Sequence, residues 1–424
     1  MPPDPENDDV GEPEEYNDDV FEDRDDTSSD PQTLPRAPLV DMDDNSFISI
    51  VDITRIHHLP VVACCCRAPD AELDDDYVKL GLFPTSFQRI RTVFTIQVLN
   101  DFRLSNLECK TSAYQYYQKL RRLTCPAFPK AVINRYRKLR RLSRQYRNLK
   151  LWKIHGRTPF ETPDAPPWLK KLALFCAACP QPGINLPAEW RSYPDYVIRR
   201  QFVLDGNFKA EHLNQKNEAD DVQLTEADAF MTAAGPYDTH REEAKKHPAR
   251  YKQVCHQGKR SRGVGCAACA RHGCFCIGSL VDFELGEKQS NMDWSVCECF
   301  KHANLNGITD VLLIYDIMCQ YHVNLFKRIT ESTHLSLPDA ITIVCAIGLF
   351  HVHGHKEECL YRFATTYIPG AGIVDGEILE TLWSVLNETS RSIRGATTAH
   401  RTEVLDDHMG DSNWKKNINM GMFY

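Results

Sequence analysis

The sequence predicts an α/β fold, preceded by a small mixed α+β module and a disordered acidic tail. From residue 171 onward, apolar strand-like runs alternate with segments of helical spacing, which is the pattern of an α/β core. Several of these runs end in an acid. The chain has 424 residues and 42% of them are hydrophobic, which is enough to bury a substantial core in two or three domains.

The acidic residues are concentrated at the N-terminus. Residues 1–30 contain 14 Asp and Glu and a single Arg, whereas the remainder has 44 acidic and 49 basic residues, a net charge of +5. Residues 1–42 contain too little apolar surface to offset the entropy of ordering. We therefore expect a disordered acidic tail followed by a mildly basic body.

Residues 43–125 form the predicted small module. Residues 46–66 indicate one or two short strands that end at Cys64, Cys65 and Cys66, and residues 80–124 indicate short helices. The chain has 17 cysteines but neither a signal peptide nor an apolar run of 18 residues, so we expect no membrane span and no secretion. In that setting cysteines are metal ligands or buried thiols more often than disulfides.

A basic segment follows at residues 119–157. Apolar residues from Val132 to Leu149 repeat at spacings of three and four, which predicts an amphipathic helix with a cationic outer face. Such a face can neutralise DNA phosphates, and a merely solvated helix surface is the alternative. A Pro-rich stretch from Pro159 to Pro167 indicates a linker, so residues 126–170 are predicted as basic helix and linker and 171–424 as the α/β domain. The DNA-contacting cations would be Arg137, Lys138, Arg140, Arg141, Arg144 and Arg147.

Two predicted strands run directly into acids. Residues 196–204 precede Asp205 and residues 311–315 precede Asp316, while Glu380 lies on a predicted helix at 376–387 with Glu377 one turn earlier. Carboxylates from two strands and a helix can converge on two Mg²⁺ or Mn²⁺ ions that cleave phosphodiesters. Ordinary strand-end and helix-surface acids are the alternative. Residues 341–353 are a further strand candidate.

Thiol and imidazole groups fall into three sets with spacings that suit zinc. The first is Cys176-x2-Cys179. The second offers more ligands than a tetrahedral site needs, and the third combines a histidine-rich stretch with a Cys-x2-His pair, for which isolated, satisfied histidines are the alternative. The members of these two sets are Cys255, His256, Cys266, Cys269, His272, Cys274 and Cys276, and His351, His353, His355, Cys359, Cys319 and His322.

Several common catalytic motifs are missing from the sequence. There is no Walker A loop, no GxGxxG after a strand, no GxSxG elbow and no HExxH. ATPase, dinucleotide oxidoreductase, serine hydrolase and zincin functions therefore have no support.

Long phrases in the chain resemble the Kyakuja-Dileera-Zisupton (KDZ) transposases of fungal and other eukaryotic genomes. They include CAACPQPGINLPAEW, LDGNFKAEHL, VLLIYDIMCQYHVNLFKRI, IPGAGIVDGEILETLW and LDDHMGDSNWKK, and the stretch from HHLPVVACCCRAP to YYQKLRRLT resembles the latter part of a CxC-type cysteine-cluster domain. The resemblance implies a DDE-type transposase with an RNase H-like core that contains a zinc-binding insertion. It implies DNA, as transposon ends and target, as the partner, the nucleus as the location, and leaves a homo-oligomer open.

The resemblance also implies site residues. Asp205 in DGNF, Asp316 in YDIMCQ and Glu380 in GEILETLWS, where Trp383 follows, correspond to the catalytic acids, with Glu377 as the alternative third acid. Cys176, Cys179, Cys269 and His272 correspond to a structural zinc site, with His355 and Cys359 as a second candidate. Because residues 1–50 lack cysteine and the chain ends soon after NWKK, we expect both domains to be shortened. A non-catalytic, zinc-stabilised DNA-binding remnant therefore stays the alternative function.

Overall fold

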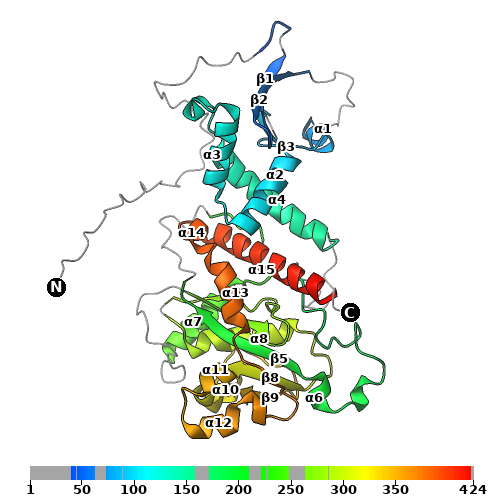
Figure 1. Cartoon of the computed structure of the whole chain (residues 1–424), viewed down its shortest axis with the longest axis vertical. Helices are drawn as coiled ribbons and strands as arrows, with labels where there is room; N and C mark the ends of the chain where they lie inside the picture. Colours follow the sequence, from blue (N-terminus) through cyan, green and yellow to red (C-terminus); the bar gives the residue numbers. More distant parts are fainter. Residues whose placement is uncertain are drawn as a thin grey trace, which may run out of the picture.

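The computed structural model describes residues 40–43, 45–62, 73–87, 89–157, 171–209, 221–225, 228–247, 263–284 and 286–421. The predicted acidic tail, apart from Val40, Asp41 and Met42, lies outside these residues. So do the Cys64–Cys66 thiols, the predicted Pro-rich linker, Cys255 and His256. Figure 1 shows a smaller N-terminal module above a larger α/β unit, with helix α15 lying between the two.

The N-terminal module combines a four-stranded mixed sheet with helices. The strand order is β2-β1-β4-β3, with β1 antiparallel to β2 and parallel to β4. The prediction of one or two short strands within residues 46–66 is thus confirmed, since β1 and β2 lie there, while the region predicted as short helices also contains two strands. The elements are β1 (Ser46–Val51), β2 (Ile56–Val61), α1 (Leu73–Lys79), β3 (Leu82–Pro84), β4 (Thr92–Thr95), α2 (Ile96–Cys109), α3 (Ala113–Thr124), η1 (Pro129–Ala131) and α4 (Tyr136–Ile154).

Helix α4 is the predicted amphipathic basic helix. Leu139, Leu142 and Tyr146 are buried in one core with residues of α2, α3 and β4, whereas Leu149 is half exposed. The helix therefore packs as part of the N-terminal module. Its apolar residues lie on one face and pack into the core of that module, as their spacing predicts.

The larger unit is built on a five-stranded mixed sheet with the order β7-β6-β5-β8-β9. Strand β5 is antiparallel to β6 and parallel to β8, and β8 is parallel to β9. The α/β class predicted from residue 171 onward is confirmed. The strands are β5 (Arg200–Asn207), β6 (Val264–Cys269), β7 (Val281–Asp282), β8 (Asp310–Tyr315) and β9 (Thr342–Ala346).

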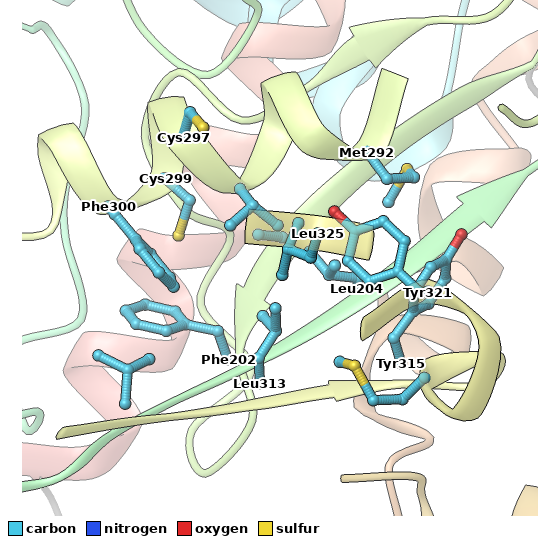
Figure 2. Close-up of a cluster of buried hydrophobic side chains, with 14 of the residues drawn as sticks. Phe202, Leu204, Met292, Cys297, Cys299, Phe300, Leu313, Tyr315, Tyr321 and Leu325 are labelled. Carbon is cyan, nitrogen blue, oxygen red and sulfur yellow. The ribbon is translucent and has the colours of Figure 1, made fainter. Parts of the chain in front are cut away.

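Alternation along the strands divides the core into two layers. Phe202 and Leu204 of β5, with Leu313 and Tyr315 of β8, pack against helix α8 (Gln289–His302) and the segment around Tyr321, as Figure 2 shows. Val203, Leu312 and Ile314 point to the opposite face, where they pack with α13 (Ile378–Asn387) and α15 (Thr398–Gly421). The sheet is thus covered on both faces.

Short helices complete the unit. Residues 341–353, predicted as one strand, form β9 only as far as Ala346; Gly348 then begins the short helix α11, because the backbone turns there against Asp375 and Gly376. Within the described ranges, no helix combines the length and apolarity that a membrane crossing requires. The remaining elements are η2 (Trp190–Ser192), α6 (Asp195–Ile198), α7 (Ala234–Lys246), α9 (Met318–Tyr321), η3 (His322–Asn324), α10 (Leu325–Thr330), α11 (Leu349–Val352), α12 (Glu357–Phe363), η4 (Thr365–Tyr367) and α14 (Ser390–Ile393).

Helix α15 joins the N-terminal module to the α/β unit through buried ion pairs. Asp407 accepts hydrogen bonds from Arg103 of α2 and from Nε of Arg147 of α4, the latter at 3.0 Å. Arg144 forms a two-pronged pair with Glu403, with both N···O distances at 2.8 Å. The two guanidinium groups hold the pKa of Asp407 below its ordinary value despite its burial.

Replacing Asp407 with Asn should destabilise the protein, because the buried guanidinium group of Arg147 and the partly buried one of Arg103 would lose their counter-charge. Removing one partner of a buried pair costs about 3 kcal/mol or more, so we expect the melting temperature to fall by about 6–12 °C. Differential scanning calorimetry measures this. Asp411→Asn is the matched control, because Asp411 pairs with Lys415 at the surface of the same helix; equal effects of the two variants would contradict the assigned role.

Candidate active site

The register of the central sheet brings Asp205 and Asp316 together. Strands β5 and β8 are parallel, and their last paired residues are Leu204 and Tyr315, so the next residue on each strand is an acid. Asp205 lies two residues after Val203, and Asp316 two residues after Ile314. Because side chains alternate along a strand, both acids lie on the same face of the sheet as Val203 and Ile314, the face that α13 covers. The carboxyl ends of adjacent parallel strands meet at one edge of a sheet, and in α/β proteins ligands bind preferentially at this edge.

Helix α13 lies against this edge and supplies the third acid. Leu379, Leu382 and Trp383 are buried in the core beneath the helix. Trp383 Nε1 donates a hydrogen bond to Asp205 Oδ2 at 2.8 Å, which fixes the helix against β5. Glu380 is exposed and lies three residues before Trp383, on the neighbouring position of the same helix face.

The other residues of the DGNF phrase also have identifiable roles. Asn207 donates to Asn387 Oδ1 at 2.8 Å, which anchors the far end of α13. Phe208 packs against Phe283, with ring centroids 5.8 Å apart. Gly206 leaves room for a carboxylate, because a Cβ at this position would lie 2.7 Å from Glu287 Oε2.

A histidine bridges the second acid and Glu377. His351 Nε2 lies 3.4 Å from Asp316 Oδ2 and 3.0 Å from Glu377 Oε1. His351 is on the helical turn α11, so the strand predicted for residues 341–353 does not extend to this histidine. Glu377 is at the N-cap of α13, one turn before Glu380.

The electrostatics of the acids show that they interact. Burial raises the pKa of Asp205 to about 8, and the charges of Asp316, Glu380 and Glu287 add to the effect. Burial and Glu380 raise the pKa of Asp316, while His351 opposes the shift. The pKa of Glu377 is raised by burial, and His351 again acts in the opposite direction. Like charges held this close favour binding of a cation.

The donor set fits a hard divalent cation. Carboxylate oxygens are the ligands that Mg²⁺ and Mn²⁺ prefer. In the described part of the chain, the buried Oε1 of Glu377 has His351 Nε2 as a neighbour at 3.0 Å but accepts no well-aligned hydrogen bond. Among the described residues, only two groups of three or more candidate ligands have all their ligand atoms within 4.8 Å of one another, and both are cysteine–histidine groups. The carboxylate oxygens of the three predicted acids are therefore spaced more widely than the ligands of a single, closed metal site.

The first of these is a buried Cys3His group compatible with structural zinc. It consists of Cys176 and Cys179 from the segment before β5, with Cys269 and His272 from the end of β6 and the following turn. His272 Nδ1 lies 3.3 Å, 3.5 Å and 3.4 Å from the sulfurs of Cys176, Cys179 and Cys269. Donation from the two other thiols lowers the pKa of Cys269 well below its ordinary value. The structure places all four predicted ligands together.

The group links two segments of the α/β unit, and α15 supports it. Asn417 donates to the Phe175 carbonyl at 3.0 Å, and Asn413 donates to Leu174 at 2.8 Å and to Phe275 at 3.0 Å. Two asparagines of one helix thus hold both sides of the cluster in place.

The other cysteines of the middle set that the structure describes, Cys266, Cys274 and Cys276, are not members of this group. Cys266 is buried in the core on the α13 side of the sheet, Cys274 is buried beside the cluster and contacts Asn417, and Cys276 interacts with Cys299. Of the five described candidates in this set, two are members of the group, Cys266 and Cys274 are buried thiols, and Cys276 is a half-buried thiol.

The second cysteine–histidine group lies near Asp316. It consists of Cys319, His355 and Cys359, with Cys319 Sγ 3.4 Å from His355 Nδ1. All three residues are half-buried. His322, the second residue of the Cys-x2-His pair, is not among them: its Nδ1 contacts the Met318 carbonyl at 2.8 Å and its ring packs on Phe363.

The six predicted DNA-contacting cations of α4 divide into two sets. Arg144 and Arg147 are held by Glu403 and Asp407, and Arg141 donates to the Thr85 carbonyl. These three side chains therefore hold the N-terminal module in place. Arg137 is exposed, and Lys138 and Arg140 are half-buried. The spacing of the basic residues could not reveal which partners they have.

The sequence reasoning missed two residues of this site. Glu287 is 6% exposed, and its Oε1 accepts a hydrogen bond from the Tyr315 hydroxyl. His351 was considered only as a zinc ligand or a satisfied histidine. No spacing pattern links Glu287 to Asp205 in the sequence, so only the packing of the loop before α8 identifies it.

The fold and the acids define the class of the protein: an α/β protein with a carboxylate site at the edge of a mixed sheet and a buried Cys3His group. The model of the Kyakuja-Dileera-Zisupton transposase family matches residues 198–413, and that of the CxC2-like cysteine cluster associated with KDZ transposases matches residues 37–127. The chain belongs to the KDZ transposase family, and this membership implies an RNase H-like core and DNA binding. Searches of curated proteins and of solved structures found no match.

Proposed function

We propose that the protein is a DNA transposase that cuts and joins DNA at a two-metal site made by Asp205, Asp316 and Glu380. The observation that carries this proposal is the parallel register of β5 and β8, which sets Asp205 and Asp316 side by side, with Trp383 fixing α13 and its Glu380 above them. Family membership supplies the class of reaction.

Each residue would have a defined part in the reaction. Asp205 and Asp316 would hold the cations, and Glu380 would complete one coordination sphere from the exposed side of the site. Mg²⁺ or Mn²⁺, when bound, supplies activation of the attacking oxygen and stabilisation of the leaving oxygen. Trp383 orients Asp205 through its indole N–H, and His351 holds Asp316 relative to Glu377. We assign Glu380 as the third acid and Glu377 as its neighbour, because Glu380 adds to the field at Asp205.

The test is a nicking assay on supercoiled DNA with the full-length chain. We expect Mg²⁺- or Mn²⁺-dependent conversion to open circles, loss of this activity with EDTA, and loss in Asp205→Asn. Salt-dependent DNA binding without any metal-dependent nicking would instead establish the non-catalytic, zinc-stabilised DNA-binding protein. Because the substrate would be chromosomal DNA, we place the protein in the nucleus.

We propose that the Cys3His group holds a structural zinc ion. Its four ligands, three thiols and one imidazole, make the closed donor set of structural zinc sites. The half-buried Cys319, His355 and Cys359 group offers three ligands for a second zinc ion, beside the helix that follows Asp316. Its ligands would tie α9 to α12 and so stabilise the loop that carries the second acid.

Arg137 should contribute to DNA binding, because it is the exposed member of the predicted set. Arg137→Ala should weaken binding of random-sequence duplex and reduce the slope of log affinity against log salt by about 1, as expected for one lost phosphate contact. Fluorescence anisotropy at several salt concentrations measures both quantities. Lys301→Ala, which removes an exposed lysine of α8, is the control; an unchanged slope in Arg137→Ala would remove Arg137 from the DNA interface.

A further inference from the structure

Glu287 is a buried carboxylate that none of the proposed steps uses. It precedes α8 and is 6% exposed, in a position where an unpaired acid is costly. Within the described residues the structure gives it one hydrogen bond, from the Tyr315 hydroxyl to Oε1. No positively charged side chain is among the groups that shift its pKa; burial and Asp316 raise this pKa to about 7.

The location of Glu287 connects it to both catalytic strands. Tyr315 immediately precedes Asp316 on β8, and Gly206 immediately follows Asp205 on β5. The glutamate touches the first through Oε1 and lies against the second through Oε2, where any larger residue than glycine would collide with it. Its carboxylate is thus held behind the two strand ends that carry the acids, on the α8 side of the sheet.

The electrostatics agree with this geometry. The Glu287 carboxylate is buried against Tyr315 and Gly206, the chain neighbours of Asp316 and Asp205, so its negative charge lies near theirs. Without a cation, the site therefore assembles carboxylates that repel one another, a cost that a bound cation would offset.

We propose that Glu287 is a fourth acid of the cation site, a positioning residue that strengthens cation binding at Asp205 and Asp316 from behind the sheet edge. This inference rests on the proposed function, since it assumes a cation at those two acids. It assigns a purpose to the glycine of DGNF, which keeps the space that the fourth carboxylate occupies. The bound cation would draw Glu287 fully into its ionised form.

The test measures cation affinity directly, without DNA and without turnover. Terbium luminescence is suited to this measurement, because the Trp383 indole donates a hydrogen bond to Asp205 and can sensitise a Tb³⁺ ion bound there. In the full-length chain, Glu287→Gln keeps the size of the side chain and an acceptor for Tyr315 but removes the charge. We expect the dissociation constant for Tb³⁺, and for Mg²⁺ in competition, to rise about fivefold to tenfold. Glu287→Asp, which keeps the charge, should lie between Glu287→Gln and the wild type.

The matched control is Glu284→Gln in the same loop, where the half-exposed acid pairs with Arg241 and Lys245; its affinity should equal that of the wild type. A Glu287→Gln affinity equal to that of the wild type would overturn the inference while Asp205→Asn still abolishes binding. Absence of Tb³⁺ binding in the wild type would instead overturn the proposed cation site itself. A merely structural role for Glu287 would lower the melting temperature without changing cation affinity, and that result would also overturn the inference.

Discussion

The Asp316→Asn variant is expected to lose strand cleavage almost completely while keeping its fold. Asn retains the shape of the side chain but is a weaker, neutral ligand. The cation it would bind is expected to stabilise the charge of the transition state by several kcal/mol. We expect the nicking rate to fall about a thousandfold, measured on supercoiled DNA with saturating Mg²⁺. Asp339→Asn, an exposed acid just before β9, is the control. Cleavage retained by Asp316→Asn would remove the assignment of the second acid.

The same variant should change how stability depends on pH. The folded-state pKa of Asp205 is raised to about 8 from an ordinary value of 3.8, so the folded protein binds a proton that the unfolded chain releases. Stability of the metal-free protein therefore falls as pH rises from about 4 to about 8, and the loss is complete above that pH. Asp316 is the largest charged contributor to the shift. Between pH 6 and 8 the melting temperature should thus fall less in Asp316→Asn than in the wild type, and an identical slope would contradict the coupling.

Removal of zinc from the Cys3His group should be the most destabilising single change. Without the metal, three buried thiols and an imidazole lose the ion that links the segment before β5 to the end of β6. The free energy of zinc binding at structural sites is folding free energy, and a loss of about 5 kcal/mol corresponds to a fall of about 15 °C in melting temperature. We expect Cys269→Ser to show this fall and to lose one equivalent of zinc in a colorimetric release assay.

Two further variants test whether zinc loss is specific to the Cys3His group. Cys109→Ser removes an exposed thiol and should change neither the zinc content nor the melting temperature. Cys359→Ser should lose a second equivalent of zinc with a smaller fall in melting temperature, because that group is half-buried and has three protein ligands. A wild-type protein without zinc, together with an unaffected Cys269→Ser, would show that the cluster is a set of buried thiols.

The sequence allowed the main elements of the catalytic unit to be predicted. Runs of apolar residues ending at Asp205 and Asp316 are strands, and the helix carrying Glu380 is α13, because period and burial are local properties. The four residues of the Cys3His group, which the resemblance to a family implies as a set, lie together in the structure. Spacing alone left seven candidates in the middle set.

Other features depended on contacts between distant segments. The sequence predicts a cationic face on residues 136–154, but Arg144 and Arg147 meet Glu403 and Asp407, more than 250 positions away. The stretch at 341–353 has strand-like composition throughout, yet the close approach of Gly348 to Gly376 ends the strand and places His351 beside Asp316.

The sequence by itself therefore determined the two strands that end in acids, the helices α4 and α13, and which thiols have metal-binding spacing. Only the tertiary structure decided which acids and thiols meet, that Glu287 lies behind the ends of β5 and β8, and that Arg144 and Arg147 of the basic helix pair with α15. The physical reason is that periodicity and spacing act over a few residues. Burial and charge pairing, in contrast, depend on which surfaces the folded chain brings into contact.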